Sequence, residues 1–349
     1  MKVCVITPYD SANYGAFLQA YATKLFLESK GHDVYFLRWR DENEKKKEFF
    51  NRPKAFKAKV RYYQRYSYLK RKYEIFTKCN NVFNTINSGE IQKCDAVIIG
   101  SDEVWNITVP KFQKDCFYGI NINDKILKLA YAPSVSNSSI EDFKCFPRQI
   151  EGMKKISLIG ARDEETKKIY DCVTGSDVDL VCDPTLLLTE KEWSFSDAKI
   201  DLDKYILVYS YDIPKTHRKM LKEIAKKRGC KLVAVGLYAS WCDLNICCTP
   251  FEFCSYIRQA EAVYTTTFHG SIFTLLNHKK CLIRATSKKL NDLLERFDVM
   301  SMKEPEQINA DEMERLLFME RDYSLFETKL CSIREESRKL YIDSLEHTS

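Results

Sequence analysis

The sequence predicts an α/β protein built from two doubly wound, Rossmann-like domains that face each other across a cleft. Three observations lead to this prediction. The chain has 349 residues, which is more than one ordinary domain holds. Short apolar strands alternate with helices through most of its length, a pattern typical of parallel sheets with crossover helices. A break in this rhythm over residues 183–204, polar in its second half, separates two such runs.

The first domain is expected over residues 1–195. It begins with a buried strand at 2–7 and a helix at 14–29, whose apolar residues recur at helical spacing and which stops before Gly31. Further strands follow at 33–37, 94–99, 126–131, 155–160 and 178–182, with a short helix at 163–172.

The second domain is expected over residues 196–322, with a final helix at about 325–345 inside the C-terminal segment 323–349. Its expected elements are the strands 205–210, 231–236, 262–266 and 280–284 and the helices 214–229, 250–260 and 270–278. Open parallel sheets bind ligands beyond the carboxyl ends of their strands. We therefore look for chemistry in the loops that lead from strand to helix.

The composition is that of a globular protein, with 45% hydrophobic and 30% charged residues. No run of ~18 apolar residues occurs, so we expect no transmembrane helix. The first residues lack the apolar core and cleavage site of a signal peptide, and we expect a cytoplasmic protein, with the inner face of the membrane as a further location.

Cysteine usage fits a reducing compartment. The chain has 14 cysteines, many within predicted strands, and we interpret them as reduced core residues. Cys242, Cys247, Cys248 and Cys254 lie close together in the sequence, but they include no CxxC pair and match no common zinc spacing. We expect no metal, although metal or iron–sulfur binding at this cluster stays open as an alternative.

The net charge of +6 is unevenly spread, because residues 38–75 hold fourteen Lys and Arg against five Asp and Glu. This basic insertion is also rich in Phe and Tyr. One interpretation is a solvated helical hairpin whose aromatic rings pack onto the domain. The other is a surface for anionic groups, either membrane headgroups or a lipid-linked substrate. No DNA- or RNA-binding motif accompanies it, so we expect no nucleic-acid partner.

The first candidate loop is PYDSANYGAFLQA, which follows the first strand. Asn13 and Gly15 stand just before a helix, where glycine lets the backbone approach a ligand and free amides can bind an anion. The loop is neither a GxGxxG nor a Walker motif. A structural turn is the alternative.

The second loop is IIGSDEVWN, with Ser101, Asp102, Trp105 and Asn106 at the end of a buried strand. A tryptophan beside polar groups can stack on a sugar ring while those groups bind its hydroxyls. The alternative is an N-cap at Ser101 or Asp102 with Trp105 buried against the sheet.

The third loop is TTTFHGS, where His269 precedes Gly270 and Ser271 at an expected helix start. A histidine there lies beside free backbone amides and can act as an acid or base near neutral pH. The alternative is a histidine that only completes a turn.

Two more positions carry charge after strands. Arg162, in IGARDEE, offers bidentate donors to a carboxylate or phosphate, or else forms a surface pair with Asp163 or Glu164. Asp183, in DPTLLL, is interpreted as part of a rigid exit turn and not as a catalytic carboxylate.

Taken in order, six stretches resemble the polysaccharide pyruvyl transferase family. They are NYGAFLQAYATKLFLESKGHDV, CDAVIIGSDEVWN, LAYAPSVS, ARDEETKKIY, DPTLLLTEKEW and EFCSYIRQAEAVYTTTFHGSIFTLLNHK, and they span nearly the whole chain. The resemblance implies two domains arranged similarly to B-type glycosyltransferases. It implies a bacterial enzyme of exopolysaccharide or cell-envelope glycan biosynthesis.

The activity that the resemblance implies is transfer of a pyruvyl group from phosphoenolpyruvate to two hydroxyls of one sugar, giving a cyclic ketal and phosphate. Phosphoenolpyruvate would be a co-substrate, with no cofactor. His269 and Arg162 match the family's catalytic and donor-binding positions. We expect donor contacts at Thr267, Phe268, Gly270, Ser271, Asn13 and Gly15, and acceptor contacts at Ser101, Asp102, Trp105 and Asn106.

One position departs from part of that family. Some members carry an arginine two residues before the histidine, where this chain has Thr267. Lys279, Lys280 or Arg284 is a candidate source of the missing charge. Two other functions stay open: a glycosyltransferase that uses a nucleotide-sugar, and a non-catalytic glycan-binding protein of the same fold.

Overall fold

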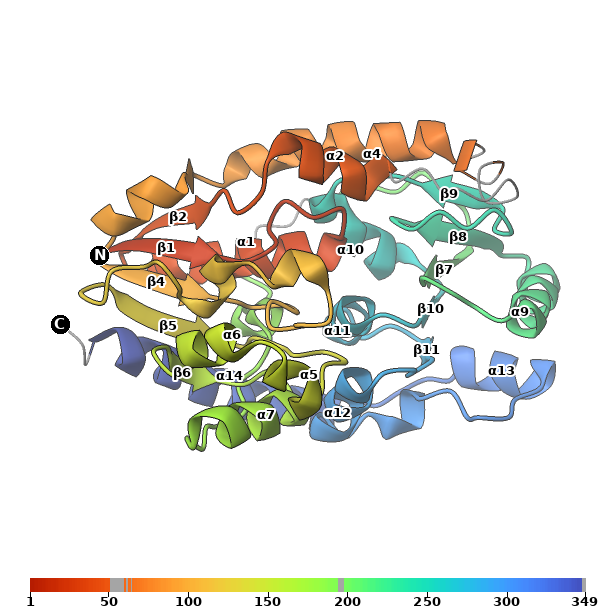
Figure 1. Ribbon diagram of the computed structural model, residues 1–349. Coiled ribbons are helices and arrows are strands. Elements are labelled where there is room, and N and C mark those ends of the chain that lie inside the picture. Colours follow the sequence, from red (N-terminus) through yellow and green to blue (C-terminus); the bar gives the residue numbers. More distant parts are fainter. Residues whose placement is uncertain (51–59, 61, 64, 194–197, 347–349) are drawn as a thin grey trace.

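The computed structural model describes residues 1–50, 60, 62–63, 65–193 and 198–346. It contains two α/β domains side by side, each built around a parallel sheet with helices on both faces (Figure 1). The carboxyl ends of both sheets face the region between the domains, so strand-to-helix loops from both sides meet there.

The sheet of the first domain has the strand order β3-β2-β1-β4-β5-β6, and all neighbours are parallel. Its strands are β1 (Lys2–Ile6), β2 (Asp33–Leu37), β3 (Thr85–Ile86), β4 (Ala96–Ile99), β5 (Leu127–Tyr131) and β6 (Ser157–Gly160). Its helices are α1 (Tyr14–Ser29), α2 (Glu42–Phe50), α4 (Tyr66–Cys79), α5 (Ile140–Lys144), α6 (Pro147–Met153), α7 (Glu164–Thr174) and α8 (Pro184–Leu187).

The sheet of the second domain has the order β11-β10-β7-β8-β9, again all parallel. Its strands are β7 (Tyr205–Tyr209), β8 (Lys231–Val235), β9 (Leu244–Ile246), β10 (Ala262–Thr265) and β11 (Cys281–Ile283). Its helices are α9 (Lys215–Arg228), α10 (Pro250–Gln259), α11 (Phe268–Leu276), α12 (Lys288–Arg296) and α13 (Ala310–Leu317).

The last helix, α14 (Ser324–Glu346), returns to the first domain, where the N-terminus also lies (Figure 1). Tyr341 of α14 is fully buried and stacks on Tyr131 with ring centroids 4.2 Å apart. The Ser337 hydroxyl accepts a hydrogen bond from the Cys182 amide. The helix therefore completes the core of the first domain.

The two domains share a continuous apolar interface at α1. The Tyr14 hydroxyl donates a hydrogen bond to the Cys248 carbonyl over 2.7 Å, and its ring lies against Phe76 and Phe253. A β-carbon at Gly236 would lie 2.1 Å from the Tyr14 ring, so only glycine fits there. One hydrophobic cluster extends through this contact from the first sheet to the second.

Most elements lie within one or two residues of their expected positions, and 14–29 and 33–37 match without change. The expected strand 178–182 is wrong: Leu180 forms only an isolated parallel bridge with Ala161, because the chain turns into Asp183 before a ladder can extend. The expected helix 270–278 begins earlier, at Phe268.

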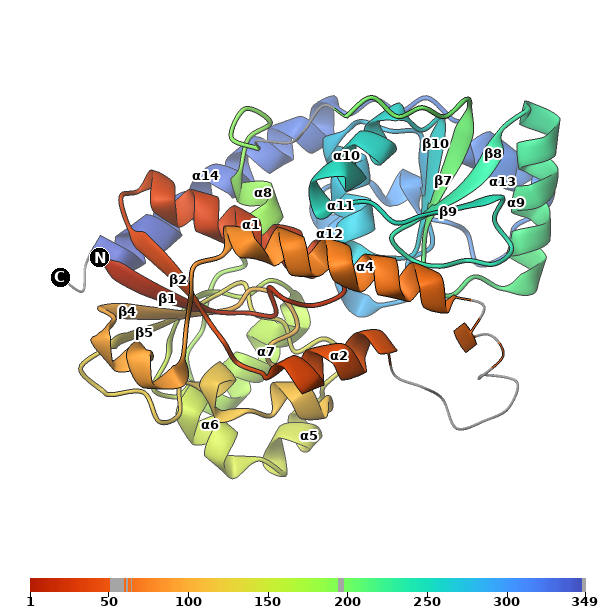
Figure 2. The same ribbon diagram turned by 90° about the horizontal axis from the view of Figure 1, so that it is seen from above.

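Part of the basic insertion lies across both domains. In Figure 2, α4 extends from the first sheet over the second domain. Lys72 is buried, and its ammonium donates to the Gly236 carbonyl over 2.7 Å, while the Tyr68 hydroxyl donates to the Ile246 carbonyl. The rings of Phe49, Phe50 and Tyr73 pack against the core, as the hairpin interpretation predicts, whereas Lys72 is buried and is neither solvated nor open to an anion. Arg52, Lys54, Lys57, Lys59 and Arg61 fall outside the described residues.

All 14 cysteines carry free thiols, and Cys242, Cys247, Cys248 and Cys254 are buried. Across the described ranges, no three His, Cys, Asp or Glu side chains gather closely enough to hold a metal ion. No described helix combines the length and apolarity needed to span a bilayer.

Candidate functional site

A polar cavity of about 270 Å³ lies between the two domains at the carboxyl ends of both sheets. Loops after β1, β4, β5 and β6 of the first domain meet loops after β7, β10 and β11 of the second. The lining residues are Asn13, Asp102, Glu103, Ser136, Asn137, Arg162, Tyr209, Tyr211, Thr266, Thr267, Phe268, His269, Thr286, Ser287 and Lys289.

His269 lies in the first turn of α11, one residue inside the helix. Thr267 is the N-cap, and its hydroxyl oxygen accepts a hydrogen bond from the Gly270 amide at 3.0 Å. Ser271 does not cap the helix: its hydroxyl donates back to the Thr267 carbonyl, and the residue is fully buried. The cap fixes the turn that carries His269 into the cavity.

Gly15 sets the position of the His269 ring. A β-carbon at Gly15 would lie 2.2 Å from His269 Nδ1 and 2.6 Å from its Cβ, so the first turn of α1 packs directly on the imidazole. Asn13 caps α1 by accepting from the Gly15 amide, and its side-chain amide donates to the Tyr211 hydroxyl across the cleft. The glycine expected to approach a ligand thus approaches the histidine that lines the cavity.

Asp183 joins His269 to Arg162. Its Oδ2 lies 3.2 Å from Arg162 Nη1 and 3.4 Å from His269 Nε2, and its Oδ1 accepts from the amide and hydroxyl of Thr185. The side chains of Arg162 and Asp183 are each 1% exposed. The exit turn therefore supplies a buried carboxylate, and Arg162 forms no surface pair with its sequence neighbours.

The charges of this cluster keep Asp183 ionised. Burial alone would raise the pKa of Asp183, but the charges of His269 and Arg162 beside it hold that pKa well below its usual range. Within the described chain, Arg162 Nε is buried without a hydrogen-bond partner. A buried donor is costly when left unpaired, so a ligand or water in the cavity would find a free donor there.

A second ion pair crosses the cavity from one domain to the other. Lys289, in the first turn of α12, pairs with Glu103 in the loop after β4. Burial raises the pKa of Glu103, yet Lys289 and Arg162 together lower it to about 2. Lys289 therefore brings a cation to the cavity wall opposite Arg162.

Three helices begin at the polar cavity: α1, α11 and α12. The first turn of a helix leaves its amides without preceding carbonyls and carries a partial positive charge. The Gly270 amide at the start of α11 already donates to the Thr267 hydroxyl, whereas the Ser287 side chain accepts no hydrogen bond from the amides at the start of α12. Together with Arg162 and Lys289, these helix ends suit a small, multiply charged anion.

The residues expected on the acceptor side separate into two groups. Asp102 lines the polar cavity, at a positive φ of 75°. Trp105 is 0% exposed, stacks on Tyr170 and donates its indole N–H to the Phe117 carbonyl, so it presents no face to a sugar ring. Ser101 and Asn106 are buried as well, bonded to the Ala132 carbonyl and to Thr108 and Ser138.

The sequence profile of the polysaccharide pyruvyl transferase family matches residues 13–288. The chain belongs to this family. The matched range contains Asn13, Arg162, Asp183 and His269, and the family is one of transferases, so the chain is a transferase. No curated protein matches the chain.

Solved structures confirm the fold. UDP-GlcNAc 2-epimerase from Methanocaldococcus jannaschii is similar, with a TM-score of 0.55, 12% sequence identity, and coverage of 98% of this chain and 99% of that one. The MnaA–UDP complex of S. aureus gives a TM-score of 0.51 at 12% identity, covering 98% and 97%. These likenesses and the two all-parallel sheets confirm the expected pair of facing Rossmann-like domains.

The cations proposed to compensate for Thr267 in this pyruvyl transferase are bound elsewhere. Lys279 donates to the Arg258 carbonyl, Lys280 pairs with Glu320, and Arg284 pairs with Glu304. None of the three lines the polar cavity among the residues described.

Sequence reasoning missed Asp183, Glu103 and Lys289 as members of the site. A signal for Asp183 was present: it follows a loop at the carboxyl end of the first sheet and precedes Pro184, which places an acidic N-cap at the start of α8. No comparable signal marked Lys289, because α12 was not predicted.

Proposed function

We propose that this pyruvyl transferase moves a pyruvyl group from phosphoenolpyruvate to two hydroxyls of one sugar in a polysaccharide or its precursor. The observation that carries the proposal is the buried contact of Asp183 with His269 and Arg162, two residues that line the polar cavity. It combines a proton-transfer group with a guanidinium suited to an acidic donor.

The proposed chemistry needs both groups. A proton adds to the methylene carbon of phosphoenolpyruvate, which becomes a methyl group, while one sugar hydroxyl adds to C2 and loses its proton. The C2–O bond to phosphate then breaks, and the neighbouring hydroxyl adds to C2 and loses its proton. One diol and one phosphoenolpyruvate thus give one cyclic ketal and one phosphate.

Each residue has a role in this proposal. His269 moves a proton to or from the reacting atoms, because it lines the cavity and its Nε2 lies beside the Asp183 carboxylate. Arg162 and the first turns of α11 and α12 hold the carboxylate and phosphate. Asp183 acts through the other two, holding the imidazole and the guanidinium in place.

The test is to incubate the purified chain with phosphoenolpyruvate and a panel of glycans. Phosphate release is followed, and the ketal methyl group is sought in the product by proton NMR. His269→Ala should lower the rate about 10²–10⁴-fold. His278→Ala is the matched control, because His278 is half-exposed at the far end of α11 and pairs with Glu327. A folded His269→Ala enzyme with full activity would overturn the assignment.

The same preparation separates the alternatives. The S. aureus neighbour was solved with UDP, so nucleotide-sugars belong in a thermal-shift panel beside phosphoenolpyruvate. Protection by a nucleotide-sugar alone would favour a glycosyltransferase. Consumption of neither donor with any acceptor would favour a non-catalytic glycan-binding protein.

A further inference from the structure

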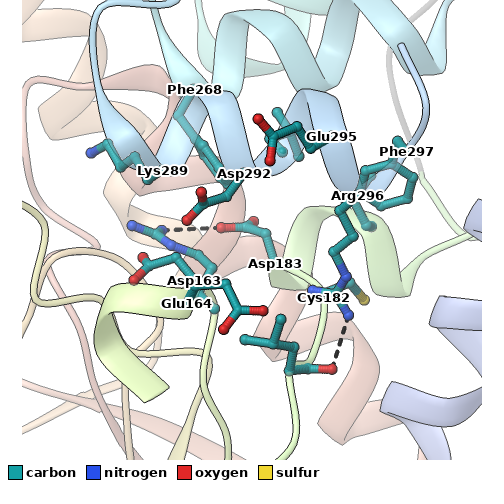
Figure 3. Close-up of a pocket in the computed structure, with 14 residues that line it drawn as sticks. Asp163, Glu164, Cys182, Asp183, Phe268, Lys289, Asp292, Glu295, Arg296 and Phe297 are labelled. Atoms are coloured by element: carbon teal, nitrogen blue, oxygen red, sulfur yellow. Dashed lines mark hydrogen bonds and ion pairs between the residues drawn. The ribbon is translucent and has the colours of Figure 1, made fainter. Parts of the chain in front are cut away.

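A second cavity, of about 310 Å³, adjoins the polar one and lies between α7, α8 and α12. Figure 3 shows the residues that line it. The two cavities share Arg162, Phe268 and Lys289 in their walls. Asp183 faces the second cavity, while its partner His269 faces the first. The volume falls in the range of roughly 300–1,000 Å³ that is usual for small-molecule sites.

The inner wall of this second cavity is apolar. It is formed by Leu180, Leu186 and Leu293 together with the rings of Phe268 and Phe297. Leu186, Leu293 and Phe297 are buried in the same core cluster. Phe268 is only partly buried, so its ring is the aromatic surface on which the C–H face of a sugar could stack.

The cations at this cavity are already neutralised or bonded. Arg296 donates to the carbonyls of Leu180 and Val181 over 2.9 and 2.8 Å. Arg162 pairs with Asp183, and Lys289 pairs with Glu103. Arg162 and Lys289 serve both cavities, but five carboxylates line the second cavity against three cations, whereas two carboxylates and these two cations line the polar one. The second cavity is therefore the less favourable of the two for an anionic ligand.

Free hydrogen-bond acceptors line the rim instead. The side chains of Glu164 and Glu295 form no hydrogen bond or ion pair with the rest of the described chain, and the Asp292 carboxylate accepts a hydrogen bond from the Glu164 amide. Burial raises the pKa of Asp292, and the negative charge of Asp163 adds to that effect. Figure 3 shows Asp292 projecting from α12 into the space beside Asp163 and Asp183. Carboxylates in this setting accept hydrogen bonds from hydroxyl groups and repel anions.

One buried donor adds to this pattern. Among the residues that the structure describes, Arg162 Nε has no hydrogen-bond partner, although the Arg162 side chain is 1% exposed and lines the cavity. A ligand that both donates and accepts hydrogen bonds would satisfy Arg162 Nε and the carboxylates together. A sugar hydroxyl has both functions.

We infer that this carboxylate-rimmed cavity (Glu164, Asp292 and Glu295 over Leu186, Leu293 and Phe297) is the subsite for the acceptor sugar. The inference rests on the proposed pyruvyl transfer, because that reaction has one anionic and one uncharged substrate, which we assign to the two adjoining cavities. The anionic donor occupies the polar cavity, and the uncharged polyol occupies its neighbour. This subsite takes the place of Trp105, on which the sequence analysis expected the acceptor sugar to stack.

The experiment is saturation-transfer difference NMR on the full chain with the methyl glycosides of glucose, galactose, mannose and N-acetylglucosamine. Leu293→Trp fills the cavity, and Asp292→Asn removes one carboxylate. Asp171→Asn is the control, since Asp171 is an exposed residue of α7 outside the cavity. Phosphoenolpyruvate binding by each variant is measured separately by thermal shift, and circular dichroism checks folding.

At least one glycoside should bind the wild-type and Asp171→Asn proteins. Its affinity should fall about tenfold or more in Asp292→Asn and be lost in Leu293→Trp, while phosphoenolpyruvate binding stays within about twofold. Absence of glycoside binding to the wild-type chain, or equal binding by folded Asp292→Asn, would overturn the inference. If Leu293→Trp lost glycoside binding but neither the wild type nor any variant showed a thermal shift with phosphoenolpyruvate, the sugar subsite would be supported. The proposed donor would then be rejected.

Discussion

The contact between Gly15 and His269 gives the sharpest test of how this site is held together. In Gly15→Ala, the added methyl carbon would stand 2.2 Å from His269 Nδ1 and 2.3 Å from its Cγ. Carbon atoms pack at about 3.5–4.0 Å, so the overlap exceeds 1 Å. Rotating the ring cannot relieve it, because the His269 β-carbon itself would be only 2.6 Å away. Helices α1 and α11 must move apart.

A displacement of about 1 Å at a catalytic group costs about 10²-fold in rate, and overpacking costs about 1–3 kcal/mol in stability. We therefore expect Gly15→Ala to lower kcat for phosphate release about 100-fold and to lower Tm. Gly89→Ala is the control, since a β-carbon at Gly89 meets no atom within 4 Å. Wild-type kcat and Tm in Gly15→Ala would refute the view that this glycine positions the histidine.

Three further predictions concern the buried charges. Asp183→Ala leaves Arg162 with one distant acidic partner and should cost about 3–5 kcal/mol in the free energy of unfolding by urea; Asp183→Asn should retain more of it while kcat falls. The pKa of Glu103 is lowered to about 2, so its carboxylate stabilises the folded state fully above its ordinary pKa near 4.5 and loses this effect as the pH falls toward 2. The difference in unfolding free energy between the wild type and Glu103→Gln should therefore shrink as the pH falls through that range. Burial lowers the pKa of Lys72 to about 8 from 10.5, so between these pH values the unfolded chain binds more protons than the folded one. The free energy of unfolding of the wild type should therefore rise by about 3 kcal/mol relative to that of Lys72→Met between pH 8 and 10.5. A difference between the two proteins that does not change with pH would contradict the burial of this ammonium.

The regular elements of the site's scaffold were readable from the sequence because each carries its own local signal. Helix 14–29 shows apolar residues at helical spacing and a glycine beyond its end, and the strand 33–37 is a short β-branched and aromatic run. The edge strands β3 and β9 were missed, since two or three residues are too few to show a period.

Only some of the site residues could be predicted from the sequence. His269, Arg162, Asn13 and Asp102 were found because each follows a strand that the pattern predicts, and the topology then brings those strand ends together. Asp183 was assigned to a turn because its partners lie 21 and 86 positions away in the chain. Local sequence gives no hint of a contact over such a separation.

Trp105 shows the opposite error. A tryptophan among polar residues at a strand end is a reasonable sugar platform from composition alone. The structure uses it as a core residue instead, stacked on Tyr170 with its indole N–H satisfied by the Phe117 carbonyl. Which face of the loop turns inward depends on the positive φ angles of Gly100 and Asp102, and this backbone path is not evident from residue types.

The return of α14 to the first domain makes the second domain an insertion within the first. The chain crosses from one domain to the other twice, once between α8 and β7 and again between α13 and α14. These two connections limit any rotation of one domain against the other. A fragment that stops before β7 would lack Ser337 and Tyr341 and leave the cleft they fill open to water. The second domain, from β7 to α13, is one uninterrupted stretch of chain, but it shares a hydrophobic cluster with the first domain and is covered by Tyr14 and α4. Neither half is therefore a self-contained module.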